Sequence, residues 1–362
     1  MRKNRKTQYK YKKHRFSRTY FTLSIFLITS CVVAAWVFYE VLSTEAADDW
    51  FETNTINSIK VSLPKDDGPH QAAMESWYFN GYLRSESGNY FSFYYAVSLA
   101  SDLATQMVSH VSLNNHQTGK HYTAQRKTVG NSSINTENRF ELIQGDWLMV
   151  GGNGNDRLKV VADDFSFDLS VVSTRAPMIH GGNGNISLDD TGDSYYYTRP
   201  RMAISGIITI GDTNEKVAGI SWFDHQWGDS SVGLLSNEWF GLQLNDGSDV
   251  MIYQLRDKSN RPMRYTGSIS QNGITETLLD TDFTIVPGKK WVSKKSKITY
   301  PIEWALTIPK KDISATIQSF NESSEFDATL TSYNIYWKGA VKVQGSHMGL
   351  GFMELNYMDM KN

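Results

Sequence analysis

Residues 76–95 read SWYFNGYLRSESGNYFSFYY, which is two aromatic-rich stretches joined by a polar turn. Short runs of aromatic and β-branched residues, bounded by Gly, Asn and Ser, are typical of β-strands connected by tight turns. Residues 237–255, NEWFGLQLNDGSDVMIYQL, repeat this order of a Trp-aromatic pair, a short strand, a polar turn and a second strand. The two copies lie about 160 residues apart. This spacing favours two related β-domains over a solenoid, whose repeats are about 20–50 residues long.

The rest of the chain after residue 50 has the same character. Further short alternating or aromatic segments occur at residues 216–227, 239–244 and 250–255, and no long stretch has helical spacing. The sequence therefore predicts an all-β fold of two β-barrel or sandwich domains. We place the first domain at residues 59–205 and the second at 206–362, with the boundary just after the stretch SYYYTRPR.

Charge is distributed unevenly along the chain. The chain carries 36 Lys and Arg and 38 Asp and Glu, but nine of the basic residues and none of the acidic ones fall in residues 1–19. The other residues therefore keep 27 basic against 38 acidic side chains, a net charge of -11. Because the negatively charged part of the chain after residue 19 repels polyanions, we expect no nucleic-acid partner.

An uncharged apolar run follows the basic segment. Residues 20–39, YFTLSIFLITSCVVAAWVFY, are long enough for a helix that crosses the hydrocarbon core of a bilayer. Since Lys and Arg prefer the cytoplasmic side, we expect a single-pass anchor in the cell inner membrane, a linker at residues 40–58, and the main body on the periplasmic or extracytoplasmic side. The alternative is a signal peptide that is cut near Thr44-Glu45-Ala46. Cys31 lies in a loose lipobox, but the apolar run continues past it, so we interpret it as an ordinary helix residue.

The sequence lacks the motifs that mark several classes of enzyme and nucleotide-binding protein. The sequence has no G-x-S-x-G elbow, no H-E-x-x-H zinc helix, no P-loop and no dinucleotide fingerprint. Its single cysteine cannot form an intrachain disulfide. Residues 151–156, GGNGND, match one unit of a calcium-binding repeat, but the only similar segment, at 181–185, lacks the Asp. We interpret both as turns, and we predict neither a metal nor a cofactor.

Several segments, in order along the chain, resemble the lipocalin-like family that includes carotenoid 1,2-hydratase and the attachment-protein homologue AttH. The resemblance covers roughly residues 60 to 358. Its motifs are LPKDDGPH (63–70), ESWYFNGYL (75–83), PMIHGGNGN (177–185), SYYYTRPRMAISG (194–206), GISWFDHQWGD (219–229), WFGLQLNDG (239–247), YPIEWALTIP (300–309) and GFMELNY (351–357). The resemblance implies two lipocalin-like β-barrel domains, and it places GISWFDHQWGD in the second.

What the resemblance implies about function leaves four alternatives open. In the hydratase branch water adds to a C=C bond of an acyclic carotenoid, and other relatives are assigned as secreted hydrolases. More distant double-lipocalin proteins cyclise polyenes. Members also accompany ABC export permeases, which favours a non-catalytic accessory that binds lipid or lipoprotein. The hydratase, cyclase and accessory interpretations share a hydrophobic small molecule, lipid or isoprenoid, as the ligand of the barrel.

The segment SWFDHQW offers chemistry for hydrating an alkene, which requires an acid and aromatic faces beside a positive charge. Because side chains alternate along a strand, Phe223, His225 and Trp227 should share one face, and Asp224 the other. The hydratase resemblance makes His225 and Trp227 a functional His-x-Trp pair. It also implies a Tyr-x-Asp further on, in which Tyr253 matches but Leu255 stands where the Asp would be. The candidate catalytic residues are therefore His225, Trp227, Tyr253 and Asp224.

A second set of residues is assigned to the walls of the ligand cavity. The candidate ligand-binding residues are Trp77, Tyr78, His110, Phe223 and Gln243. The competing interpretation of Trp77 and Tyr78 is packing in the core, and that of the His-x-Trp pair is a scaffold role. We interpret Glu75 and His110 as a polar pair near the mouth of the first barrel, joined by a structural hydrogen bond.

Overall fold

The computed structural model describes residues 60–101, 105–130, 138–187, 192–229, 236–257 and 261–357. The predicted basic segment, membrane anchor and linker, at residues 1–58, lie outside the described residues. Within the described ranges the fold is all-β, as predicted, and the helices are single 3-10 turns, η1 (Lys65–Asp67) and η4 (Pro309–Lys311). No helix in these ranges is long and apolar enough to cross a membrane.

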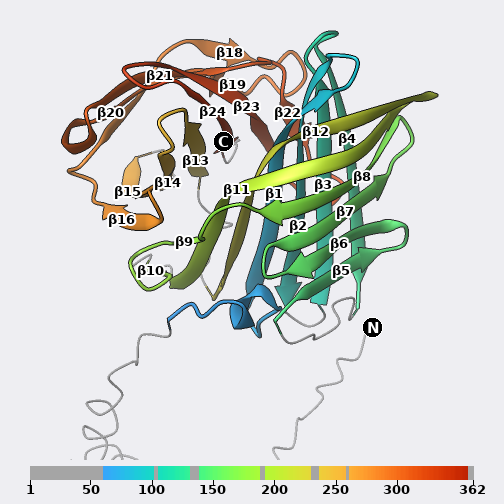
Figure 1. Ribbon diagram of the computed structural model, residues 1–362, viewed down its shortest axis with the longest axis horizontal. Coiled ribbons are helices and arrows are strands. Elements are labelled where there is room, and N and C mark those ends of the chain that lie inside the picture. The colour runs from blue at the N-terminus through green and yellow to red at the C-terminus, as the bar shows by residue number, and fades with distance from the viewer. Residues whose placement is uncertain are drawn as a thin grey trace, which may run out of the picture. The chain divides into compact units, whose positions relative to one another are not determined.

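The first half of the described chain forms one antiparallel, barrel-like sheet of 12 strands, drawn from blue to yellow in Figure 1. Its main path runs in the order β4-β3-β2-β1-β12-β11-β8-β7-β6-β5, and β9 and β10 pair with β11. The strands are β1 (Met74–Ser85), β2 (Tyr90–Ser101), β3 (Thr105–Asn115), β4 (Lys120–Val129), β5 (Phe140–Gln144), β6 (Trp147–Gly152), β7 (Asn155–Val161), β8 (Phe165–Ser173), β9 (Met178–Ile179), β10 (Asn185–Ser187), β11 (Asp193–Ile210) and β12 (Thr213–Gly228).

Side chains join the two edge strands of this sheet, β4 and β5. Gln144 at the end of β5 donates hydrogen bonds to the Met107 carbonyl (2.9 Å) and to Thr128 Oγ1 (3.0 Å). Arg126 on β4 donates to the Gln144 carbonyl at 2.7 Å, and its guanidinium lies 4.3 Å from the centre of the Trp147 ring. The sheet therefore curls round until its first and last strands are in contact.

The second half forms a sheet of 10 strands, drawn from ochre to red in Figure 1, and a separate two-stranded sheet. The main path is β16-β15-β14-β13-β24-β23-β21-β20-β17, with β22 paired to β23. Its strands are β13 (Ser236–Leu244), β14 (Asp249–Arg256), β15 (Pro262–Gln271), β16 (Ile274–Leu278), β17 (Thr284–Pro287), β20 (Glu303–Ile308), β21 (Ile313–Ser319), β22 (Glu325–Asp327), β23 (Ile335–Gly345) and β24 (Gly349–Asn356). The small sheet pairs β18 (Lys290–Val292) with β19 (Thr299–Pro301).

The sequence repeat corresponds to the centre of each sheet. Residues 76–95 belong to the hairpin β1–β2, and residues 237–255 to β13–β14. In each sheet the first strand pairs on one side with the second strand and on the other with the last, β12 or β24. The two halves therefore share one topology around their central strands, as the repeat predicts.

The boundary predicted between residues 205 and 206 is wrong, because it falls inside β11. That strand continues to Ile210 and pairs with β12, and both belong to the first sheet. The chain passes from the first sheet to the second between Gly228, the last residue of β12, and Ser236, the first residue of β13. As a consequence the segment GISWFDHQWGD, which we expected in the second domain, lies mainly in β12 at the centre of the first sheet.

Alternation along β1 and β12 separates two apolar regions. Odd-numbered residues such as Trp77, Phe79 and Phe223 point into the core of the first barrel, with β7 and β8 side chains around them. Even-numbered Trp222 faces the other way, in a buried cluster with Trp239 and Tyr253 of the second sheet. The outer face of the first sheet thus packs against the second sheet.

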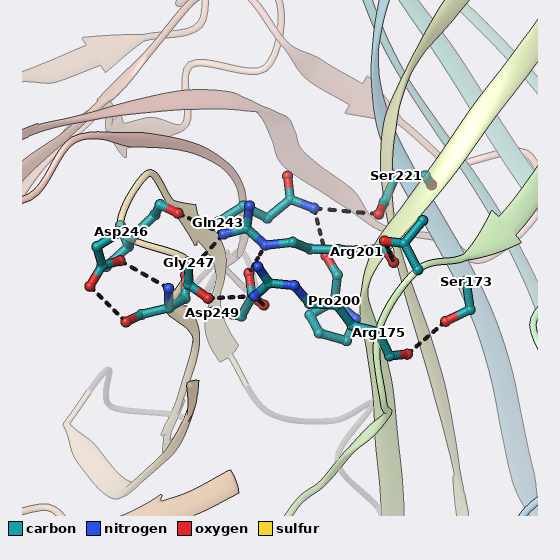
Figure 2. Close-up of polar contacts among 12 residues, drawn as sticks. Ser173, Arg175, Pro200, Arg201, Ser221, Gln243, Asp246, Gly247 and Asp249 are labelled. Atoms are coloured by element: carbon teal, nitrogen blue, oxygen red, sulfur yellow. Dashed lines mark hydrogen bonds and ion pairs between the residues drawn. The ribbon is translucent and has the colours of Figure 1, made fainter. Parts of the chain in front are cut away.

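A network of ion pairs connects the two sheets at one point of their contact, shown in Figure 2. Arg201 on β11 donates to Asp249 Oδ1 at 2.7 Å, and Arg175 lies 3.2 Å from Oδ2 of the same carboxylate. Asp249 is 1 % exposed and begins β14. Burial raises the pKa of Asp249 to about 6, although both arginines lower it. Two cations from the first half thus share one buried anion from the second.

Gln243, which we predicted to bind ligand, belongs to the same contact. Its amide donates to the Pro200 carbonyl at 2.6 Å and lies 3.4 Å from the Ser221 carbonyl (Figure 2). It satisfies backbone acceptors of β11 and β12 and is not among the residues that line the cleft described below. Its assignment as a ligand-binding residue is therefore not supported, and it holds the two halves together.

The leading segment, residues 60–73, is tied to the first barrel by a buried ion pair. Asp67 in η1 accepts two hydrogen bonds from Arg199 Nη2, at 2.6 and 2.9 Å, and one from the Tyr197 hydroxyl at 2.5 Å. The side chains of Asp67 and Arg199 are 1 % and 5 % exposed. Removing one partner of such a pair leaves an uncompensated buried charge.

We therefore expect Asp67→Asn to lower the free energy of unfolding by about 3 kcal/mol. The matched control is Asp168→Asn, which breaks an Arg157–Asp168 pair of similar geometry (2.9 and 2.7 Å) whose side chains are 55 % and 43 % exposed. That change should cost less than about 1 kcal/mol. Urea unfolding followed by tryptophan fluorescence measures both, and equal losses would contradict the structural role of the buried pair.

Candidate functional site

A cleft with a volume of about 430 Å³ lies between the two sheets. Strands β1, β2, β3, β11 and β12 form one wall, and β13, β14, β23 and β24 form the other. The loop at residues 331–334 contributes a further part of the lining. Eight large aromatic side chains line it: Tyr78, Tyr94, Tyr196, Trp227, Trp239, Tyr253, Tyr333 and Tyr336.

Asp224 on β12 is a buried carboxyl group in the wall of this cleft. Its Oδ1 accepts hydrogen bonds from Tyr196 (2.8 Å), Thr198 (2.5 Å) and the Trp222 indole (3.0 Å). Its Oδ2 accepts none from the described residues. Burial raises the pKa of Asp224 to about 6, against these three hydrogen bonds, which lower it. Because Oδ1 is saturated, a proton on this acid is carried by Oδ2.

Lys338 on β23 brings a buried positive charge to the other wall of the cleft. Its ammonium pairs with Glu354 on β24 at 2.7 Å. It also lies 4.8 Å from the ring centre of Tyr78, 5.0 Å from that of Tyr94 and 5.7 Å from that of Trp239. Aromatic faces attract cations in this geometry. The cleft therefore contains an aromatic cage that stabilises positive charge.

His110 on β3 lines the cleft beside the aromatic cage. Its Nδ1 lies 2.9 Å from the Tyr336 hydroxyl, which in turn lies 2.6 Å from the Tyr94 hydroxyl. Its Nε2 lies 2.8 Å from Thr331 Oγ1. Burial, helped by Lys338, lowers the pKa of His110 to about 4, so the ring is neutral at physiological pH. Both ring nitrogens are engaged across the junction of the two sheets, and the predicted polar pair of His110 with Glu75 is wrong.

Tyr253 and Tyr78, both predicted site residues, lie in the cleft wall. The Tyr253 hydroxyl has no hydrogen-bond partner among the residues that the structure describes, and burial raises the pKa of this phenol well above its usual value. It therefore stays protonated and can donate to a ligand. Leu255, where the resemblance implies an Asp, is a buried apolar residue in the cluster between the sheets.

The opposite face of β12 carries His225 into the first barrel, as strand alternation predicts. The His225 side chain is fully buried, stacks on Trp77 at 4.5 Å between ring centres, and bonds through Nε2 to Glu75 at 2.8 Å. Trp77 and Phe223 are core residues of the same barrel. None of these three predicted residues lines the cleft. Their side chains point to the other side of the sheet from Asp224.

Trp227 occupies the end of β12, where the two regions meet. It packs in the core of the first barrel and also lines the cleft. Its ring stacks on His70 with 4.0 Å between centres and 2° between planes. Of the predicted His-x-Trp pair, Trp227 is therefore the member that a ligand in the cleft can touch.

The sequence did not identify the charged pair Lys338–Glu354. The two residues are directly paired across β23 and β24, but they lie 16 positions apart, and neither belongs to a recognisable motif. The one available signal is a lysine in a run that is otherwise apolar or small, IYWKGAV at residues 335–341. A buried lysine needs a partner, and the strand pairing supplies it.

Together these groups can perform proton transfer beside a developing positive charge. A carboxyl group with a pKa of about 6 is a general acid that also gives up its proton readily near neutral pH. The aromatic cage stabilises a cation, and Glu354 provides a second carboxylate in the same cleft. This chemistry suits the addition or removal of water at a carbon that passes through a cationic state.

Comparison with known proteins identifies relatives with the same architecture. The crystal structure of a protein assigned to AttH from Nitrosomonas europaea superposes with a TM-score of 0.73 at 22% identity, covering 83% of this chain and 98% of that one. Kievitone hydratase from Nectria haematococca superposes with a TM-score of 0.69 at 19% identity, covering 84% and 94%. The dehydratase asqC of Emericella nidulans is 24% identical over 253 residues, which is 66% of this chain and 70% of that protein.

The family model described as AttH-like matches residues 54–357. The match extends over both sheets and includes the cleft between them. The chain therefore belongs to the AttH-like family.

Proposed function

We propose that this protein adds water to, or removes water from, a hydrophobic substrate bound in the cleft between the two sheets. Two relatives that share its fold or part of its sequence are named for such reactions, kievitone hydratase and the dehydratase asqC. The direction of the reaction and the substrate are not carried over from them. The proposal depends on the chemistry of this chain's own cleft.

The observation that carries the proposal is the free oxygen of Asp224. Three donors saturate Oδ1, so the acidic proton is directed to Oδ2 of a residue in the cleft wall. A carboxylic acid whose pKa is raised towards neutral pH by burial is suited to protonate a carbon atom. The Tyr196 hydroxyl that fixes Asp224 is itself held by the Trp239 indole at 3.0 Å. The acid is therefore positioned by residues of both sheets.

In the hydration direction, the Asp224 Oδ2–H bond breaks and its proton forms a C–H bond with one carbon of a C=C group. The electron pair of the double bond is used in that bond, which leaves a carbocation at the second carbon and a carboxylate at Asp224. Water then forms a C–O bond to the cation. Its surplus proton passes to Glu354, the second acid of the cleft wall. Dehydration follows the same steps in reverse.

The cage of Tyr78, Tyr94 and Trp239 contributes the stabilisation of the cation. These rings face the Lys338 ammonium, a geometry that supports their role in holding a positive charge. A cation–π contact is worth about 2 kcal/mol where water is excluded. Glu354 neutralises the Lys338 ammonium, so the cage contains no unpaired buried charge.

His225 does not touch substrate under this proposal, because its ring lies on the barrel side of β12. Trp227 forms one end of the cleft and contacts the substrate directly. We also propose that the reaction takes place at the outer side of a membrane, to which residues 20–39 anchor the chain. The support for this location is the basic segment and apolar run of the sequence.

We expect Asp224→Asn to reduce turnover by about a hundredfold or more, because the amide cannot donate a proton to carbon. The assay incubates the protein with acyclic isoprenoid alkenes in oxygen-18 water and follows the labelled alcohol by mass spectrometry. The control is Asp156→Asn, another buried acid with a raised pKa, about 7, that does not line the cleft. Undiminished product from the Asp224 variant would rule out this mechanism, and binding without any product would favour the accessory role.

The pH dependence has a definite sign. Asp224 is protonated below about pH 6, so kcat/KM for hydration should be constant there and should fall about tenfold per unit above it. Dehydration starts from the form with Asp224 as carboxylate and the proton on Glu354, which carries the same number of protons; because the overall reaction takes up no net proton, kcat/KM for dehydration should follow the same pH dependence as hydration. A hydration rate that increases from pH 5 to pH 8 would contradict Asp224 as the acid, and profiles of both directions measure this.

A further inference from the structure

Three side chains with metal-binding atoms converge at one end of the first barrel. His70 comes from the leading segment, Glu75 from β1 and His225 from β12. His70 Nδ1 lies 2.7 Å from Glu75 Oε1, and His225 Nε2 lies 2.8 Å from the same oxygen. All three potential ligand atoms lie within 4.8 Å of one another. This cluster is on the barrel side of β12, away from Asp224.

We propose that His70, Glu75 and His225 form a binding site for a divalent transition-metal cation, with zinc as the best match. Two imidazoles and one carboxylate are a ligand set that zinc accepts, with a fourth position left for water. The set has two nitrogen ligands and only one oxygen ligand, which disfavours calcium and magnesium. The site is independent of the proposed chemistry in the cleft.

The ligand atoms must adjust to hold the ion: two of their separations lengthen, and the third, between the nitrogens of His70 and His225, is at most 4.8 Å and must reach about 3.3 Å. Metal–ligand distances of about 2.0–2.1 Å in a tetrahedral site place neighbouring ligand atoms about 3.3 Å apart. The two hydrogen-bonded distances of 2.7 and 2.8 Å must therefore lengthen by roughly half an ångström. Replacing two short hydrogen bonds by a bridging cation moves the side chains outward while they keep their orientation.

The surroundings place a carboxylate beside the second nitrogen of His70, as metal sites commonly do, whereas Nδ1 of His225 is buried without a hydrogen-bond partner among the described residues. His70 directs its other nitrogen, Nε2, towards Asp66 Oδ1 at 3.6 Å, and the Ser62 amide holds that carboxylate at 2.7 Å. Metal-bound histidines usually donate this second N–H to a carboxylate. Trp227 covers His70 and Trp77 covers His225, so both rings are stacked against indoles.

Two carboxylates face the histidines of this cluster. Glu75 contacts both imidazoles, and Asp66 Oδ1 lies 3.6 Å from His70 Nε2. Opposite charge beside the ligand atoms favours a cation at this position. The nearby Asp67 is already neutralised by Arg199.

Access to the site is from the side of His70. That side chain is 22% exposed, whereas Glu75 and His225 are 2% and 0% exposed. A bound ion would join the leading segment to β1 and β12, three segments that are otherwise connected here by hydrogen bonds. Metal binding should therefore stabilise the folded barrel, because the unfolded chain has no such arrangement of ligands.

The test titrates the untagged full-length chain, in mild detergent and stripped with a chelator, with zinc in a calorimeter. We expect about one zinc per chain, a rise of about 5 °C in Tm at saturation, and visible absorption bands of low-coordinate Co²⁺ when cobalt replaces zinc. His70→Ala should weaken zinc binding by at least about a hundredfold, and Asp66→Asn by about tenfold.

His347→Ala is the matched control, because His347 is 21% exposed and also lies 3.6 Å from an aspartate, Asp246. It should bind zinc as the unaltered chain does. The metal-free Tm of each variant shows whether it is folded. Equal zinc binding by the His70 and His347 variants, or no binding at micromolar zinc by the unaltered chain, would overturn the proposal. Both outcomes are read without substrate, so they are separate from any failure of Asp224 chemistry.

Discussion

The pairing of β1 with β12 is the constraint on which the rest of this structure depends. Twelve residue pairs, from Met74 opposite Gly228 to Ser85 opposite Val217, join strands that lie far apart in the sequence. The register opposes Trp77 to His225 and Tyr78 to Asp224. Because side chains alternate, one face of the pair supplies the barrel core with its His–Glu cluster, and the other supplies the acid of the cleft. A shift by one residue would exchange these two environments.

The two faces treat their ionisable groups differently. Asp224 accepts three hydrogen bonds on one oxygen, yet burial outweighs them and raises its pKa to about 6. Glu75 is almost as deeply buried, yet two histidines keep it ionised. One layer of sheet separates Asp224 from Glu75. The strand pair β1–β12 therefore carries a proton-donating acid on one face and a charged carboxylate on the other. This arrangement lets a cation-binding cluster and a cation-stabilising cleft coexist.

The sequence predicted the class of fold and the repeat because both depend on local patterns. The hairpins at 76–95 and 237–255 are where the aromatic runs place them, and the alternation of Asp224 and His225 follows from the strand period alone. The sequence could not determine which sheet a strand joins, so the predicted domain boundary falls inside β11.

Nor could the sequence identify His70–Glu75–His225 or Lys338–Glu354 as clusters, since their members come from separate strands and segments without fixed spacing. Trp77 and Gln243 are residue types that also occur in cavity walls. Only the three-dimensional contacts show that Trp77 lies in the barrel core and that Gln243 lies at the junction of the two sheets.

The long interval between β1 and β12 also affects how the chain is made. During translation β1 can pair with β2 soon after both emerge, but its other edge stays open until residue 228 has left the ribosome. Throughout that interval the nascent chain presents an unpaired strand rich in Trp, Tyr and Phe, which is a site for mispairing. A ribosome-bound fragment that ends near residue 205 therefore exposes an incomplete sheet. The first barrel becomes a folding unit only with the strand that carries Asp224 and His225.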